Sequence, residues 1–313
     1  MTKSSFHEPV MLREAVDSLG CMPGGTYFDG TLGGGGHAYE ILARTSPDGI
    51  LVGVDRDSDA LSEAERRLKV FKGRASLVKG NFADIRNILS GLGIERVNGI
   101  LLDLGVSSHQ FDTADRGFVF SLDAPLDMRM DQEDDLTAFD IVNGFSEEKL
   151  KKIIKDYGEE MMPGRIVRAI SERRRLSPIR TTGELAAIIA GALPGHLKKK
   201  RIHPATKTFQ ALRIAVNNEL VNLHNAIESG IDMLEKEGRI SIISFHSLED
   251  RMVKTLFRSW EKGCICPPDF PVCCCNRKSK LKLLTRKAVM PGKAEITFNP
   301  RARSARLRTA IRI

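Results

Sequence analysis

The feature that most constrains the fold is a glycine-rich segment between two short apolar runs near the N-terminus. The first run ends in Asp29, the chain continues as Gly30-Thr-Leu-Gly-Gly-Gly-Gly-His37, and the second run is Ile50-Leu-Val-Gly-Val-Asp55. Four consecutive glycines suit neither a strand nor a helix, but they let the backbone pass close to a ligand. An acid that ends the second strand about twenty residues on suits a pair of ribose hydroxyls. The segment therefore predicts the first half of a nucleotide-type cofactor site.

The glycine pattern is compatible with two classes of cofactor. Gly33-x-Gly35-x-x-Ala38 satisfies the relaxed dinucleotide fingerprint of a dehydrogenase. Two details favour S-adenosylmethionine. The acid Asp29 ends the first strand, and the glycine run suits close contact with a sulfonium amino acid better than binding of a pyrophosphate. The motif by itself thus favours a methyltransferase over a dehydrogenase, and a purely structural tight turn is the third alternative.

The length of 313 residues predicts one large domain with an insertion or appendage. The hydrophobic content of 42% and charged content of 28% are ordinary for a soluble globular protein, and no apolar run is long enough for a membrane helix. The first eight residues lack the apolar region of a secretion signal. We therefore expect a cytoplasmic protein.

The net charge of +8 is distributed unevenly along the chain. From Asn276 to Ile313 there are twelve Lys and Arg residues against the single Glu295, a net of +11, which leaves 8 − 11 = −3 for the rest. A second basic cluster lies between Arg165 and Arg201, whereas the segment from Asp123 to Asp140 is acidic. Two separate basic clusters favour a nucleic-acid partner, although a solvated face is the alternative for either one.

Strands and helices alternate after the glycine segment. We expect a helix over 58–71, a strand over 75–79 ending near Phe82, a helix over 85–92 and a strand over 99–103 ending in Asp103. Such alternation predicts a parallel, doubly wound α/β sheet, in which ligands bind at the carboxyl ends of the strands.

The alternation stops for about a hundred residues and then resumes. Residues 136–197 have a helical pattern with an N-cap at Thr181, a long amphipathic helix runs from Phe209 to Leu234 and stops at Gly238, and a fifth strand covers 239–245. We therefore predict a first sheet part over 1–134, an inserted all-α substrate-recognition domain over 135–203, and a second sheet part with a basic C-terminal tail over 204–313.

Several long strings lie at these strand ends or beside them, and together they resemble the bacterial ribosomal RNA small subunit methyltransferase H family, formerly called MraW. The resemblance covers the chain from His7 to the C-terminus and rests on His7-Glu-Pro-Val10, Asp29-Gly-Thr-Leu-Gly-Gly-Gly-Gly-His37, Leu102-Asp-Leu-Gly-Val-Ser-Ser108, Arg116-Gly-Phe118, Pro125-Leu-Asp-Met-Arg-Met130, Tyr157-Gly-Glu-Glu160, His203-Pro-Ala-Thr206, Thr208-Phe-Gln-Ala-Leu-Arg-Ile214, Ser244-Phe-His-Ser-Leu-Glu-Asp250 and Asn299-Pro-Arg-x-Arg-Ser-Ala305.

The resemblance implies a Rossmann-like class I methyltransferase sheet and a defined activity. Members of the family use S-adenosyl-L-methionine to methylate the N4 atom of a cytidine in the decoding region of 16S ribosomal RNA. The implied partners are 16S rRNA and the small ribosomal subunit, with a homodimer as a further option. The implied cofactor-binding residues are Gly35, Gly36, His37, Asp55, Phe82, Asp103 and Gln110.

Asp103 is the candidate catalytic residue. Cytosine N4 is a poor nucleophile because its lone pair is delocalised into the ring, and an acceptor for the amino hydrogens would localise that pair. Many amino-group methyltransferases place Asp or Asn before Pro-Pro-aromatic at the fourth strand end, where this chain has Asp103 before Leu104-Gly-Val106. A role in cofactor binding alone is the alternative.

Other candidates have two interpretations each. His246, Ser247 and Asp250 could form a hydrolase triad, but a strand-to-helix junction commonly uses Ser as N-cap and an acid in the first turn. We favour the interpretation that this segment forms a wall of the pocket that holds a flipped cytosine. Asp127, Arg129 and Arg213 are candidates for substrate contact, with internal salt bridging as the alternative for Arg129.

Five of the six cysteines lie between Cys264 and Cys275. Disulfides are not expected in a reducing cytoplasm. Two Cys-x-Cys pairs across a proline-rich turn could hold zinc, but their spacing is tighter than in the usual structural site. The sequence assigns no metal, and zinc and free thiols are the alternatives for Cys264, Cys266, Cys273 and Cys275.

The basic clusters do not distinguish an rRNA methyltransferase from one that acts on DNA or another RNA. Basic side chains contact phosphates, which all nucleic acids share, rather than bases. A nucleic-acid-binding protein without turnover is the alternative from another class. The intact glycines and Asp55 argue against it.

Overall fold

The computed structural model describes residues 9–107, 110–111, 113–195, 203–267, 270–275 and 277–313. The chain forms two compact units, Met1–Gly105 with Leu220–Ile313, and Val106–Glu219. No helix of the described ranges is both long and apolar enough to cross a membrane. The lysine-rich part of the second basic cluster, 198–201, lies outside the described residues.

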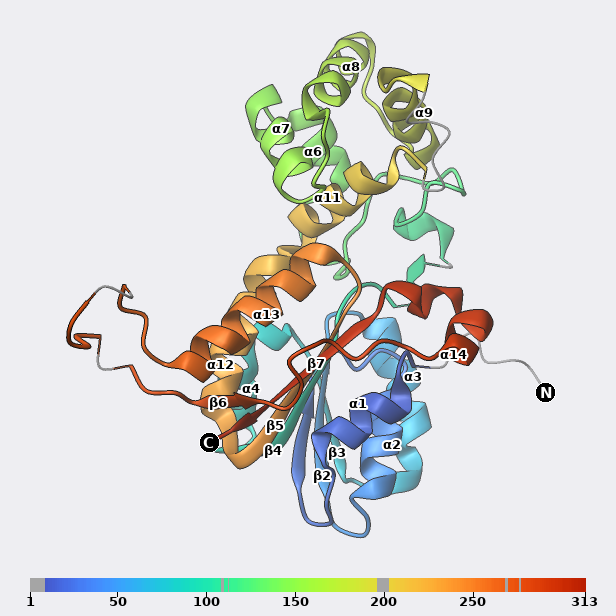
Figure 1. Cartoon of the computed structure of the whole chain (residues 1–313). Helices are drawn as coiled ribbons and strands as arrows, with labels where there is room; N and C mark the ends of the chain where they lie inside the picture. Colours follow the sequence, from blue (N-terminus) through green and yellow to red (C-terminus); the bar gives the residue numbers. More distant parts are fainter. Residues whose placement is uncertain (1–8, 108–109, 112, 196–202, 268–269, 276) are drawn as a thin grey trace. The chain divides into compact units, whose positions relative to one another are not determined.

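The first unit contains a seven-stranded sheet with the strand order β3-β2-β1-β4-β5-β7-β6 (Figure 1). The strands are β1 (Thr26–Asp29), β2 (Ile50–Asp55), β3 (Ala75–Lys79), β4 (Val97–Asp103), β5 (Leu234–Ser244), β6 (Leu281–Leu283) and β7 (Arg306–Arg312). Strands β1 to β5 are parallel, and β7 is antiparallel to β5 and β6. The predicted parallel doubly wound sheet is confirmed, and part of the segment that composition identifies only as a basic tail forms strands β6 and β7.

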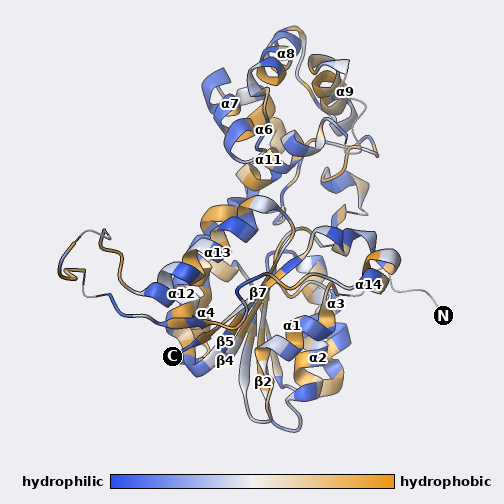
Figure 2. Cartoon of the chain, in the orientation of Figure 1, coloured by the Kyte–Doolittle hydropathy of each residue, from blue (hydrophilic) through white to orange (hydrophobic). Residues whose placement is uncertain are grey.

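Helices cover both faces of this sheet because successive strand residues point to opposite sides. Tyr27 and Leu101 pack in one core, and their neighbours Phe28 and Leu102 pack in the other. The first core includes residues of α1 (Leu12–Leu19), α2 (Gly36–Arg44) and α3 (Ser58–Leu68). The short turn η1 (Lys69–Phe71) follows α3. The second core includes residues of α4 (Ile85–Gly91), α12 (Glu219–Met233) and α13 (Ser247–Lys262). Figure 2 shows hydrophobic residues along the strands between these helices.

The second unit is helical around its own core. Its helices are α6 (Ala138–Gly144), α7 (Glu147–Asp156), α8 (Pro163–Leu176), α9 (Thr182–Ala192) and α11 (Thr206–Asn217). The predicted N-cap is confirmed, because Thr181 Oγ1 accepts from the Glu184 amide at 3.2 Å. The unit is larger than the predicted insertion over 135–203: Phe118 and Met128 on one side, and Phe209 on the other, belong to the same core. Phe118, Leu126 and Met128 are buried in this core but lie in irregular backbone after the short turn η3 (Ala114–Arg116), so helical periodicity could not reveal this boundary.

The single long helix predicted from Phe209 to Leu234 is wrong. Helix α11 ends at Asn217, and Asn218 takes the left-handed conformation, with φ of 52°, before α12 begins. Asparagine tolerates that conformation, so it ends a helix without interrupting the apolar spacing. The predicted stop at Gly238 is also wrong, since α12 ends at Met233 and β5 begins at Leu234.

Candidate cofactor site at the strand ends

The glycine-rich loop joins β1 to α2 and is bonded to the neighbouring strands. The Gly30 amide donates to the Leu101 carbonyl of β4 at 3.0 Å. The Gly33 amide donates to the Asp55 carboxylate at the end of β2, at 2.8 Å. The loop is therefore held at the carboxyl ends of three adjacent strands, the edge at which open α/β sheets bind ligands.

Two glycines of the loop are required by geometry. A Cβ atom on Gly30 would lie 2.5 Å from the Leu102 side chain and 2.8 Å from Cβ of Phe82, which begins the turn η2 (Phe82–Asp84) after β3. Gly35 has a φ of +75°, and a Cβ there would lie 3.2 Å from Ala64. A side chain would push the loop away from β4 and η2 at Gly30, and away from α3 at Gly35.

Three carboxylates end the adjacent strands β1, β2 and β4. Burial raises the pKa of Asp29 to about 7 and that of Asp55 to about 6. Burial also raises the pKa of Asp103 well above its usual range, and the charges of Asp29, Glu249 and Glu295 raise it further. One oxygen of Asp29 and one of Asp103 are buried with no hydrogen-bond partner among the described residues. Such a site favours a ligand that brings positive charge or hydrogen-bond donors.

His37, in the first turn of α2, is buried beside this carboxylate group. Its Nε2 atom lies 3.1 Å from the Val10 carbonyl oxygen, and its Nδ1 atom lies 3.8 Å from Asp103 Oδ2. Burial lowers the pKa of His37 to about 4, so the ring is neutral at physiological pH. Because 3.8 Å exceeds hydrogen-bonding distance, the ring does not satisfy Asp103.

The predicted cofactor residues of the first unit all follow the ends of β1 to β4. They are Gly35, Gly36, His37, Asp55, Phe82 and Asp103. Gln110 belongs to the second unit, where it is buried and its Oε1 atom accepts from the Ser107 amide at 3.0 Å.

Two further residues at this edge were not predicted from the sequence as site residues. Thr31 Oγ1 accepts from the Asp103 amide at 2.6 Å and so joins the glycine loop to β4. Glu295, in α14 (Lys293–Phe298), accepts from the Met11 amide at 2.7 Å, and its charge acts on Asp103. The signal for Glu295 is its isolation, since it is the single acid among the basic residues of the C-terminal segment.

The segment at the end of β5 is a helix cap rather than a hydrolase triad. His246 is the N-cap of α13, so the expectation of Ser at the cap is wrong. The Glu249 carboxylate accepts from the Phe245 and His246 amides at 2.8 and 3.2 Å. Asp250 accepts from the guanidinium groups of Arg306 and Arg308 at 2.9 and 2.7 Å. The acids of this segment thus serve a capping box and two β7 arginines.

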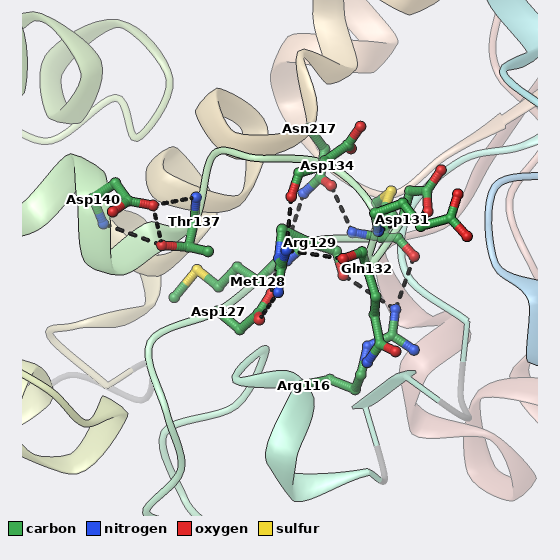
Figure 3. Close-up of polar contacts among 12 residues, drawn as sticks. Arg116, Asp127, Met128, Arg129, Asp131, Gln132, Asp134, Thr137, Asp140 and Asn217 are labelled. Atoms are coloured by element: carbon green, nitrogen blue, oxygen red, sulfur yellow. Dashed lines mark hydrogen bonds and ion pairs between the residues drawn. The ribbon is translucent and has the colours of Figure 1, made fainter.

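In the second unit, Arg129 lies in a closely bonded loop (Figure 3). Its Nε and Nη2 atoms donate to the two carboxylate oxygens of Asp127 at 2.9 and 2.7 Å, and its Nη1 atom donates to the carbonyls of Gln132 and Asp134. Arg116 donates to the Met130 carbonyl at 2.8 Å. The alternative of internal salt bridging is therefore confirmed for Arg129.

The other candidate arginines of this unit differ in their surroundings. Arg213 forms a bidentate pair with Glu219, with both distances 2.8 Å. Arg173 pairs with Glu184, and Arg174 donates to the Val142 carbonyl. Arg165 and Arg168 are exposed on α8 and line a groove with acidic and basic residues of α7. These two arginines are the better candidates for a polyanion contact.

Comparisons with known proteins agree with this geometry. The family model described as the MraW methylase family matches residues 4–313. A relative from Syntrophus aciditrophicus, named ribosomal RNA small subunit methyltransferase H, is 61% identical over 99% of each chain. Relatives of the same name from Syntrophotalea carbinolica and Lachnospira eligens are 52% and 48% identical, over 100% and 98% of each chain.

These matches confirm the family that the strings in the sequence indicate, together with its Rossmann-like methyltransferase sheet, and they overturn the dehydrogenase alternative. The match extends over both compact units and includes the strand-end carboxylates. The chain belongs to the MraW methylase family.

Proposed function

We propose that this chain transfers a methyl group from S-adenosyl-L-methionine to the N4 atom of a cytidine in the decoding region of 16S rRNA, in the small ribosomal subunit. The observation that carries the proposal is Asp103, whose buried Oδ1 atom has no hydrogen-bond partner in the described structure, at a strand end beside the glycine loop. The names of the curated relatives support the choice of small-subunit rRNA.

The residues at the strand ends fit the methyl donor of this family. S-adenosyl-L-methionine, when bound, supplies an electrophilic methyl group on a positively charged sulfur. Asp29 offers a buried oxygen without a partner among the described residues, and Gly30 and Gly35 let the loop pack closely against Leu102, Phe82 and Ala64 beside it. We assign the ribose hydroxyls to Asp55, whose oxygens accept from Gly33 and Asp57 and have further lone pairs.

Asp103 has the chemistry to orient the nucleophile. Methyl transfer from a sulfonium is an in-line displacement with a good leaving group, so positioning of the two reactants and exclusion of water are the main requirements. An Asp103 carboxylate oxygen that accepts from the cytosine amino group would localise the N4 lone pair. Burial and the neighbouring acids raise the pKa of Asp103, and the positive sulfonium of a bound donor would favour its ionised form. Thr31 Oγ1 accepts from the Asp103 amide at 2.6 Å and so holds the Asp103 backbone at the end of β4.

The RNA itself is assigned to the helical second unit and the basic C-terminal segment. Arg165 and Arg168 of α8 are exposed and can reach phosphates. The target base must be turned out of its stack to meet the methyl group, at a cost of about a few kcal/mol. A structured RNA with an accessible cytidine is therefore the expected substrate.

The test is transfer of labelled methyl from S-adenosyl-L-methionine to small ribosomal subunits from cells that lack this protein, with the nucleosides of the product separated. Label in N4-methylcytidine supports donor, substrate and target atom together. Label on DNA or on another RNA only would replace the substrate. Donor binding without transfer to any nucleic acid would support a binding protein without turnover.

A further inference from the structure

Between α13 and β6 lies a long loop, whose described residues, 263–267, 270–275 and 277–280, form no helix or strand and are not used by the methyl-transfer site. Figure 1 shows it as an orange excursion that leaves the body of the first unit beside α12 and β6. At its base, the Lys280 amide donates to the Trp260 carbonyl at 3.0 Å, and a Cβ atom on Gly263 would lie 2.4 Å from the Ser279 amide nitrogen. The loop is thus closed at its base by direct contact of its two ends.

The outer part of this loop has no hydrophobic core of its own. Ile265, Phe270 and Val272 are 61%, 53% and 74% exposed. Figure 2 shows orange, hydrophobic stretches in the loop, yet none of these three side chains belongs to a core cluster of the described residues. Loops of this length without secondary structure are uncommon in compact domains, and small segments without a core are commonly held by a metal or a disulfide.

Four cysteine sulfurs converge within the loop. The Sγ atoms of Cys264, Cys266, Cys273 and Cys275 all lie within 4.8 Å of one another. Cys264 is 3.5 Å from Cys273 and 3.8 Å from Cys275, and Cys273 is 3.6 Å from Cys275. The fold therefore joins two Cys-x-Cys pairs that are separated by a proline-containing turn.

These distances match a metal-bound tetrathiolate rather than disulfides. A disulfide requires about 2.05 Å between its sulfur atoms. In a tetrahedral zinc site with Zn–S bonds of about 2.3 Å, the sulfur atoms are about 3.8 Å apart. The three sulfur distances among Cys264, Cys273 and Cys275 lie close to the second value. The short spacing within each pair is therefore no obstacle, because the fold brings the sulfur atoms of both pairs together.

We propose that Cys264, Cys266, Cys273 and Cys275 bind one Zn²⁺ ion as a closed, structural site that holds the loop in place. Four thiolates complete the coordination, so no position is open for substrate or water. Each thiol gives its proton to solvent as its sulfur binds the ion, and no oxidant is needed. Cys274 Sγ lies 3.7 Å from Cys266 Sγ but does not belong to the group of four sulfurs that all lie within 4.8 Å of one another. We therefore assign it no ligand role, and it serves as the matched control.

The test begins with the metal content of the full-length protein, purified from medium with ordinary trace metals and without a chelator. The expected result is about one zinc per chain. Replacement of the ion by Co²⁺ gives the intense visible bands of tetrahedral cobalt thiolate. Cys273→Ser and Cys264→Ser lose tight zinc binding and the cobalt bands, whereas Cys274→Ser and the distant Cys21→Ser keep both.

Limited trypsin digestion gives a second readout in the same protein. Chelation exposes the loop, so cleavage after Arg277 and Lys278 becomes faster in wild type and in Cys274→Ser, and zinc restores protection. Cys273→Ser is cleaved fast with or without zinc. Thermal unfolding distinguishes loss of the site from loss of the whole fold.

Three results would overturn the proposal. One is a wild-type chain that takes up neither zinc nor cobalt and whose loop thiols all react freely. The second is a pair of disulfides in the purified protein. The third is a Cys274→Ser variant that loses zinc as fully as Cys273→Ser, which would show that the four ligands are not those assigned.

Discussion

Asp29 and Asp103 end the paired parallel strands β1 and β4, and each has a buried carboxylate oxygen without a hydrogen-bond partner among the described residues. The negative charge of Asp29 raises the pKa of Asp103, after the larger effect of burial. The chain thus places two unsatisfied acids side by side at the ligand edge of its sheet. An arrangement of this kind costs stability and indicates a binding function.

Replacement of Asp103 by Asn separates catalysis from cofactor binding. We expect Asp103→Asn to lower kcat for methyl transfer by about a hundredfold or more, because the carboxylate acceptor for the amino hydrogens is lost. The affinity for S-adenosyl-L-methionine, measured by titration calorimetry, should change little. Asp48→Asn changes the charge equally at an exposed loop position and should leave both values unchanged. Normal binding and normal turnover in Asp103→Asn would reject the catalytic role, and loss of binding alone would limit Asp103 to the cofactor.

The pKa of Asp29 predicts how stability depends on pH. Burial raises the pKa of this carboxyl to about 7, whereas an unfolded Asp titrates near 3.9. Between these values the folded state binds the extra proton, so the group contributes full stability below about pH 4 and this contribution is lost as the pH rises towards 7. We expect Asp29→Asn, without ligand, to show a shallower fall in unfolding free energy over this range, measured by urea denaturation. An unchanged pH slope would show that Asp29 is not buried in the way described.

The close contacts of Gly30 predict that adding one methyl group at this position lowers the free energy of unfolding. A Cβ atom there meets Leu102 and Phe82 at 2.5 and 2.8 Å, so Gly30→Ala should destabilise the protein by about 1–3 kcal/mol and weaken donor binding. Gly91→Ala, at the end of α4, has nothing within 4 Å and is the control. Equal unfolding midpoints for the two variants would contradict the described loop.

The exposed arginines of α8 provide a test of RNA binding that is separate from methyl transfer. Arg165→Ala together with Arg168→Ala should lower the affinity for small-subunit RNA and reduce its salt dependence by about one unit of slope for each lost phosphate contact. The affinity for S-adenosyl-L-methionine should stay unchanged. Arg66→Ala, an exposed arginine on α3 paired with Glu63, is the control. A double variant with unchanged RNA affinity and salt slope would show that this surface of α8 does not bind the substrate.

The repeating parts of the first unit were predictable from sequence. The apolar strands and their terminal acids follow from local patterns, because short continuous apolar runs that end in an acid or a glycine-containing turn alternate with helical stretches. The strand β7 was not predictable, because five of its seven residues are Arg, Thr or Ala and its pairing with β5 is formed over a distance of about sixty residues. Two of its three arginines, Arg306 and Arg308, are paired with Asp250, an interaction that composition cannot show.

In the candidate site too, residues placed by local patterns were predictable, and residues placed by contacts between distant segments were not. Asp29, Asp55 and Asp103 follow their own strands, so the pattern places them at one edge. Glu295 reaches this edge from the far end of the chain through its bond to the Met11 amide, and no local signal gives that pairing. The break at Asn218 is similarly hidden, because the apolar spacing of α11 continues into α12. Contacts between segments distant in sequence account for most of what the patterns do not reveal.

The most direct test of the central proposal is the identity of the methylated nucleoside in small-subunit RNA. Digested 16S rRNA from cells with and without this protein is compared by mass spectrometry against N4-methylcytidine, C5-methylcytidine and 2′-O-methylcytidine standards. We predict an N4-methylcytidine signal that is absent without the protein, returns with the wild-type chain and does not return with Asp103→Asn. A methyl group on C5 or on the ribose, or an N4 signal fully restored by Asp103→Asn, would contradict the proposal.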